Sequence, residues 1–170
     1  MPKASSRYPN VVQQEVARLL VRGSEGTLEA VSLAREDDLD MVVSIPHEGP
    51  GVIGLRIETS SRLTKGPFGE WLVIDAAAPT FHFQHDPRAL FVFGHFVPAD
   101  DAFTGPIFMV PAAFVESRPG LKGKSARLTF RARLDAVNQE WSDFAFAPDQ
   151  IGMRLLDLLR EMPNYQQQAA

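Results

Sequence analysis

Three charged residues fall at positions where two paired strands would bring them together. Asp40 opens a predicted strand over residues 39–45, and Arg56 and Glu58 lie two apart in a predicted strand over 52–59. The segment between these strands contains two prolines and two glycines, which indicates a turn. We therefore expect the Asp40 carboxylate to lie beside the Arg56–Glu58 pair. Carboxylates gathered in this way could supply oxygen ligands to a hard cation.

An N-terminal helix is the first element that would position this cluster. It is predicted to run from Pro9, with Asn10 as its cap, to Gly23, a common stop residue. Its apolar stripe consists of Val12, Val16, Leu19 and Leu20. Glu15 lies beside this stripe, so it either covers the edge of the core or adds a carboxylate to the site. The first role is the more common one for such a residue.

The rest of the chain alternates between strand patterns and breaks. Further strands are predicted over 27–34, 71–75, 80–84, 90–97 and 107–110, with a loop over 60–70, a turn over 98–106 and a short helix from Pro111. A last helix begins near Pro148, with a buried stripe formed by Ile151, Leu155, Leu158, Leu159 and Met162. The fold class is α/β, a mixed central sheet flanked by an N-terminal and a C-terminal helix. We expect one domain over 9–163, with flexible termini at 1–8 and 164–170.

A basic stretch precedes this last helix. Residues 118–133 contain no acid and six basic residues, which are Arg118, Lys122, Lys124, Arg127, Arg131 and Arg133. Around residues 127–134, apolar residues alternate with polar ones, which predicts a strand with one apolar and one basic face. Such a face could contact nucleic-acid phosphates. The more common explanation is a solvent-facing strand that carries charge for solubility and edge protection.

Composition bounds the class of protein. The 170 residues are 45% hydrophobic and 22% charged, as in ordinary soluble domains. The absence of cysteine excludes disulfides and thiolate metal sites, and is compatible with a cytoplasmic location. No apolar run is long enough to span a bilayer, so we expect no membrane partner. The net charge of -4 gives no global attraction to nucleic acid.

Other familiar sites are absent or weak. The chain has no Gly-x-Ser-x-Gly elbow and neither of the common glycine-rich nucleotide-binding motifs. His82, His85 and His95 could suggest a metal site, but positions 82 and 85 face opposite sides of an extended strand. We interpret them as separate histidines.

The order of these segments resembles the PD-(D/E)xK nuclease superfamily, whose fold is restriction-endonuclease-like. The resemblance rests on a helix carrying Glu15, then DLDMVV, then VIGLRIETSS, followed by apolar strands, and covers roughly residues 10–160 as a pattern. It implies a Mg²⁺-dependent phosphodiesterase site. Asp40 matches the family's first carboxylate, and Glu15 matches its helix glutamate. The metal ligands would be Asp40 and Glu58.

The second strand departs from the family pattern. In one register Arg56 takes the acidic position and Glu58 the lysine position, so the two signs are exchanged. In the other, Glu58 is the acid and Ser60 stands at the lysine position, which leaves no base. The first register suits the strand alternation better. Arginine serves neither as a metal ligand nor as a base, so either register predicts impaired hydrolysis.

These observations leave three functional hypotheses. The first is a nuclease-like domain that engages nucleic acid through Lys122, Lys124, Arg127, Arg131 and Arg133, with Mg²⁺-dependent hydrolysis at Asp40, Glu58, Glu15 and Arg56 impaired. The second is a non-catalytic interaction or regulatory protein on the same scaffold. The third is a small-ligand-binding β-rich protein. A homodimer is compatible with all three.

Overall fold

The computed structural model describes residues 8–33, 39–49, 51–77, 88–117, 127–135 and 140–162. The predicted strand over 80–84 with His82, and the following His85, lie outside these residues, as do Lys122, Lys124 and the termini except Tyr8. Tyr8 begins the first helix, one residue before its predicted start at Pro9.

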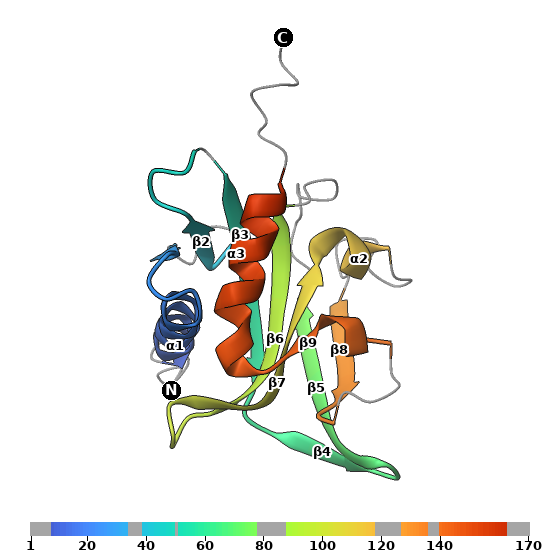
Figure 1. Cartoon of the computed structure of the whole chain (residues 1–170). Helices are drawn as coiled ribbons and strands as arrows, with labels where there is room; N and C mark the ends of the chain where they lie inside the picture. Colours follow the sequence, from blue (N-terminus) through green and yellow to red (C-terminus); the bar gives the residue numbers. More distant parts are fainter. Residues whose placement is uncertain are drawn as a thin grey trace.

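A mixed six-stranded sheet, here called sheet A, forms the centre (Figure 1). Its strands, in spatial order, are β1 (Glu29–Ser32), β2 (Met41–Ser44), β3 (Val52–Ser60), β6 (Ala89–Val97), β7 (Ala102–Pro111) and β9 (Ala145–Phe146). Neighbours are antiparallel except β3 and β6, which run parallel. The α/β class and the mixed sheet are confirmed.

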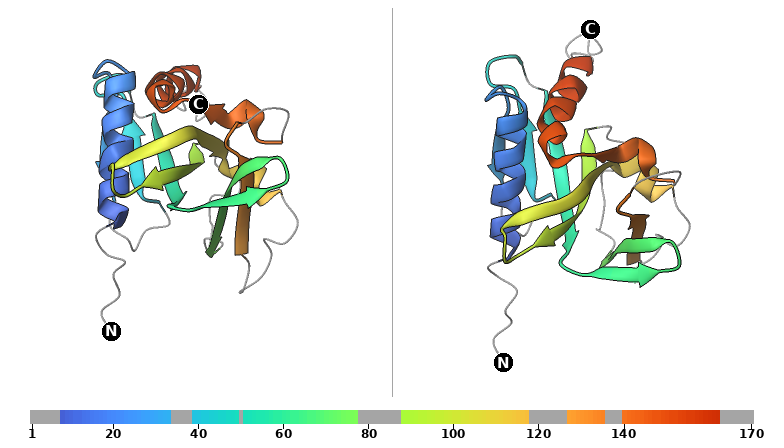
Figure 2. Two further views of the ribbon diagram at one scale, coloured as in Figure 1. Left: turned by 90° about the horizontal axis from the view of Figure 1, so that it is seen from below. Right: turned by 60° about the horizontal axis from the view of Figure 1, so that its bottom comes forward.

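Two helices cover one face of sheet A (Figure 2). They are α1 (Tyr8–Gly23) and α3 (Ile151–Glu161), and a 3-10 turn, η2 (Pro148–Gln150), leads into α3. The predicted α1 stripe is buried in full, and it shares one core with α3 and with alternate residues of β2, β3 and β6. The expected helices therefore lie side by side on the same face.

The helices cross closely at two glycines. A Cβ added to Gly152 would lie 2.5 Å from the Leu20 carbonyl oxygen and 2.7 Å from the Gly23 carbonyl carbon. A Cβ on Gly23 would approach the Asp149 carbonyl oxygen to 2.9 Å. The small residues allow backbone-to-backbone packing of α3 against the end of α1.

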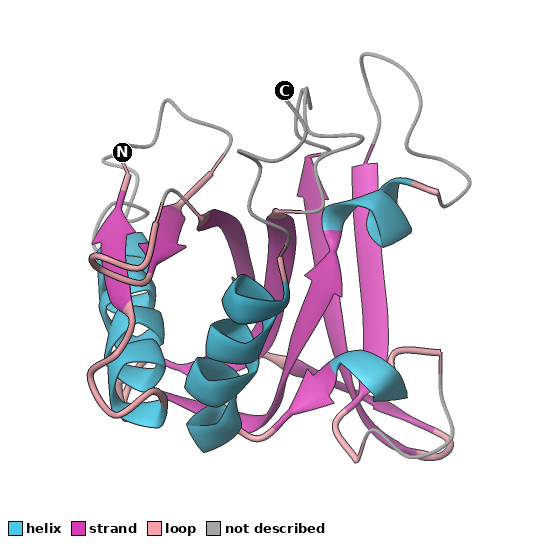
Figure 3. Cartoon of the chain, turned by 45° about the horizontal axis from the view of Figure 1, so that its top comes forward, coloured by secondary structure: helices cyan, strands magenta, loops and turns pink. Residues whose placement is uncertain are grey.

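A second sheet packs against β6 and β7 on the face of sheet A opposite the helices (all strands are magenta in Figure 3). This sheet B has the order β4 (Leu63–Gly66), β5 (Gly69–Ala77) and β8 (Arg127–Arg133). The core between the sheets, together with α2 (Ala112–Glu116), is rich in aromatic rings. The ring of Phe130 in β8 stacks on the Phe93 ring with 4.1 Å between the ring centroids. It contacts the Phe108 ring edge-on, with 5.2 Å between the centroids.

Several sequence predictions need correction. Residues 60–70 are not a loop, because β4 and the start of β5 pair as a hairpin turning at Pro67 and Phe68. The predicted turn over 98–106 is shorter, because β7 already begins at Ala102. The strands were expected in one central sheet, whereas β5 and β8 belong to sheet B. Alternation along a strand marks its buried face but does not say which sheet it joins.

Candidate active site

Asp40 lies where β2 begins. Met41 is paired with Leu55, so Asp40 stands opposite Arg56, the next residue along β3. The Asp40 backbone N–H donates to the Leu55 carbonyl at 2.8 Å, which extends the ladder by one bond. The register of β2 with β3 ends at the Met41–Leu55 pair. Beyond that pair the Asp40 carboxylate contacts β3, since Oδ2 accepts from the Ile57 backbone N–H at 2.7 Å.

The second oxygen of Asp40 faces α1. Gln13 Nε2 lies 3.4 Å from Asp40 Oδ1, and Gln13 is only 7% exposed. Gln13 was not among the site residues predicted from the sequence. A signal was present, because Gln13 precedes Val16 by three positions and Leu20 by seven, which places an amide within the apolar stripe. A buried amide needs a polar partner, and Asp40 provides it.

Arg56 and Glu58 meet Asp40 as the sequence predicted. Arg56 Nε lies 2.9 Å from Glu58 Oε1 and 3.9 Å from Asp40 Oδ2. Both side chains belong to the face of β3 opposite Ile53 and Leu55, which pack under the helices. We call Asp40, Arg56 and Glu58 the triad.

Burial controls the acidity of Glu58. β6 places Phe91 beside Arg56 and Phe93 beside Glu58, so the triad borders the aromatic core. Loss of water around the carboxylate raises the pKa of Glu58 above its ordinary 4.5, and Arg56 opposes this effect. The nearby charge of Asp40 raises the pKa of Glu58 further.

Glu15 does not complete this site. Glu15 is 9% exposed in α1, and its carboxylate forms a bidentate ion pair with Arg18, with N–O distances of 2.6 and 2.7 Å. Throughout the part of the chain that the structure describes, no group of three or more His, Cys, Asp or Glu side chains is arranged to hold a metal ion. The expected three-carboxylate set of Glu15, Asp40 and Glu58 is therefore not formed.

The triad fits Mg²⁺ poorly. This ion needs several oxygen ligands in octahedral geometry. Both Asp40 oxygens accept hydrogen bonds, and the Glu58 carboxylate is paired with Arg56. The positive charge that balances the Asp40 and Glu58 carboxylates comes from the guanidinium of Arg56, which cannot be a metal ligand. Ser60, the lysine position of the alternative register, bonds through its hydroxyl to the backbone of Arg62.

The predicted basic face lies on sheet B, away from the triad. The burial of β8 alternates as expected, with Leu128, Phe130 and Ala132 inside. Arg127 and Arg131 are exposed on the other face.

Two arginines of this face have neighbours. The Arg131 guanidinium lies 4.5 Å from the centroid of the Trp71 ring. Arg133 forms a bidentate pair with Asp135, which raises the pKa of Arg133. Arg127 and Arg131 thus provide the positive charge of this face in the described residues.

His95, the third histidine considered, has a structural partner. It is 9% exposed, and its Nδ1 lies 2.5 Å from the Thr104 hydroxyl, across the β6–β7 pair.

No helix within the described ranges combines the length and apolar character needed to cross a membrane. No protein-family model, curated protein or solved structure matches this chain.

Proposed function

We propose that this chain is a nuclease-like domain that engages nucleic acid, and that the guanidinium of Arg56 serves its two carboxylates in place of a divalent cation. The observation that carries the proposal is the triad, in which Asp40 meets two strand-borne charges beside an opening helix. This is the set of elements by which the sequence resembles PD-(D/E)xK nucleases.

The chemistry of the triad favours binding without hydrolysis. Phosphodiester cleavage needs an activated water and stabilisation of charge on the phosphate, which two-carboxylate nucleases obtain from metal ions. Arg56 provides one fixed positive charge and no site for a metal-bound water. Its Nε already bonds to Glu58, so the exchanged signs give a closed ion-pair network.

The outer face of sheet B supports nucleic-acid engagement. Arg127 and Arg131 are exposed on one side of β8, and Arg131 stacks on Trp71. Arginines on such a face suit phosphate contacts, which weaken strongly as salt rises. Lys122 and Lys124 precede this strand in the sequence and add to the same basic stretch.

A salt-dependent binding assay tests this surface. Anisotropy of labelled single- and double-stranded DNA and RNA would be measured from about 50 to about 200 mM salt. We expect affinity to fall with salt, and the Arg127→Glu, Arg131→Glu double variant to weaken binding and flatten the slope. A control with the same change of charge is Arg22→Glu, Arg62→Glu, on exposed positions of α1 and the β3–β4 turn. Equal loss in both variants, or salt-independent binding, would contradict the assignment of the surface.

A second assay tests the triad. Wild-type protein should not cleave any of these substrates with Mg²⁺ or Mn²⁺. The exchange Arg56→Asp with Glu58→Lys restores the family's order of charges, and we expect it to gain metal-dependent cleavage that Asp40→Ala abolishes. Wild-type cleavage that depends on Asp40 would overturn the role given to Arg56. A folded but inactive exchange variant would count against the nuclease kinship.

The closed triad also favours a second candidate, a non-catalytic interaction protein. Its three side chains already satisfy one another. Absence of binding to every nucleic acid in the first assay would select this candidate.

A further inference from the structure

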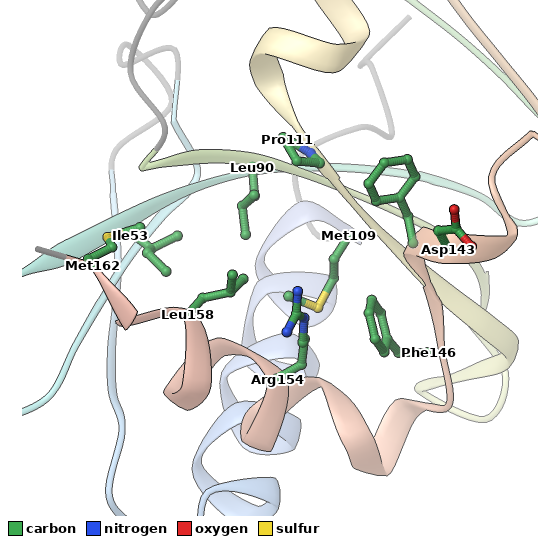
Figure 4. A pocket seen from close by; sticks show the side chains of 10 residues that line it. Ile53, Leu90, Met109, Pro111, Asp143, Phe146, Arg154, Leu158 and Met162 are labelled. Atoms are coloured by element: carbon green, nitrogen blue, oxygen red, sulfur yellow. The ribbon is translucent and has the colours of Figure 1, made fainter. Parts of the chain in front are cut away.

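A pocket of about 140 Å³ lies between α3 and the helix-covered face of sheet A (Figure 4). Its floor consists of Ile53, Leu90 and Met109, one residue from each of three neighbouring strands. All three are buried, with exposures of 0%, 5% and 4%. The floor is therefore part of the hydrophobic core.

The walls come from α3 and the segment before it. Arg154 and Leu158 of α3, and Met162 directly after its end, recur every four residues and line the pocket (Figure 4). The buried α3 residues Ile151, Leu155 and Leu159 form another stripe, which packs into the core. This division explains why Leu158 and Met162, both predicted as core, are only partly buried.

One side chain gives the pocket its chemical character. The Arg154 guanidinium carbon lies 5.8 Å from the centroid of the Phe146 ring, and Arg154 is half-buried. Asp143 lines the same pocket, yet within the described residues Arg154 forms no ion pair with any carboxylate. Arginine remains charged at all physiological pH values. Among the residues that the structure describes, the pocket therefore combines an apolar floor with a cation that has no ion-pair partner.

From this combination we propose that the pocket binds a small apolar monocarboxylate, with its hydrocarbon part on the Ile53–Leu90–Met109 floor and its carboxylate on Arg154. The size supports one ring or a short branched chain, because a dry cavity of about 150 Å³ accommodates benzene. Arginine matches a carboxylate with two parallel N–H donors. This inference is independent of the nucleic-acid proposal, since the pocket lies on the helix-covered face of sheet A.

Benzoate is the probe. Benzyl alcohol is the control that keeps the aromatic ring but has no charge, and acetate is the control that keeps the carboxylate but has no ring. A methyl NMR titration would follow Met109 and Leu158. We expect saturable shifts with benzoate, at a Kd on the order of millimolar for so small a ligand. Benzyl alcohol should bind more weakly, and acetate should give no saturable shift.

Variants separate the cation from the cavity. Arg154→Gln should weaken the affinity for benzoate about tenfold, since only the charged hydrogen bonds are lost. The affinity for benzyl alcohol should stay nearly unchanged. Arg160→Gln, an exposed arginine on the same helix near Glu48, should leave both unchanged. Leu158→Trp should fill the cavity and abolish both.

Three results would overturn the proposal: no saturable benzoate shift, benzyl alcohol binding as tightly as benzoate, or equal loss in Arg154→Gln and Arg160→Gln. The Leu158→Trp variant keeps the test decisive if Arg154→Gln unfolds, because shifts that survive a filled cavity exclude binding there.

Discussion

The carboxylate of Asp40 accepts a 2.7 Å hydrogen bond from the backbone N–H of Ile57, at the point where β2 no longer provides a strand partner. A side chain thus continues the ladder and at the same time meets Arg56. Asp40 therefore has a structural role even in the absence of catalysis.

The first prediction concerns this bond. Asp40→Ala leaves the Ile57 N–H and Gln13 without their acceptor, so the free energy of unfolding should fall by about 1–3 kcal/mol. Asp40→Asn should lose less free energy of unfolding, because its amide oxygen can still accept the hydrogen bond from the Ile57 backbone N–H. Urea denaturation measures both. Asp157→Ala, at an exposed position of α3, should stay within about 0.5 kcal/mol of wild type, and an equal loss there would refute the structural role.

The second prediction concerns pH and Glu58. Burial raises the pKa of Glu58 above 4.5 in the folded state. Between the unfolded-state and the folded-state pKa of Glu58, the folded protein binds more protons than the unfolded chain. The stabilising contribution of Glu58 is therefore complete below about pH 4.5 and is lost as pH rises through the folded-state pKa.

Denaturation of wild type and Glu58→Gln across about pH 4 to about pH 7 isolates this contribution, because the other titrating groups largely cancel in the difference. We expect wild type to lose stability relative to Glu58→Gln as pH rises. A difference that stays constant, or that changes in the opposite direction, would show that burial does not control this carboxyl.

The third prediction concerns the helix crossing. Alanine normally stabilises a helix interior relative to glycine by up to about 1 kcal/mol. At Gly152 the new Cβ would lie 2.5 Å from the Leu20 carbonyl oxygen, so Gly152→Ala should instead destabilise by about 1–3 kcal/mol. Thermal unfolding reads this out as a lower Tm. Met153→Ala, at the exposed neighbouring position, should change Tm little, and a Tm increase for Gly152→Ala would contradict the close crossing.

The fourth prediction concerns the core between the sheets. Phe130 is 1% exposed and contacts Phe93, Phe108 and Trp141. Phe130→Ala should reduce the free energy of unfolding by about 3–5 kcal/mol, since it leaves a cavity where the two sheets meet.

Its matched control is Phe68→Ala at the tip of the β4–β5 hairpin, where the ring is 72% exposed. We expect that change to stay within about 0.5 kcal/mol of wild type. Comparable losses at both positions in a denaturant titration would argue against packing of sheet B on sheet A.

The sequence determined the features that depend on local spacing. Helical periodicity identified α1 and its buried stripe, and alternation identified both faces of β8. A short turn between two strand patterns placed Asp40 beside Arg56 and Glu58, because strands adjacent in sequence pair with each other. These relations involve neighbours along the chain or across one turn.

Only the tertiary structure decided the features that depend on which surfaces meet. It assigned β5 and β8 to a second sheet, paired Glu15 with Arg18 and brought Gln13 to Asp40. It also left Arg154 facing an apolar pocket without an ion-pair partner in the described residues. Periodicity specifies which face of an element is buried, but the partner of that face depends on packing between residues distant in sequence, which local pattern does not encode.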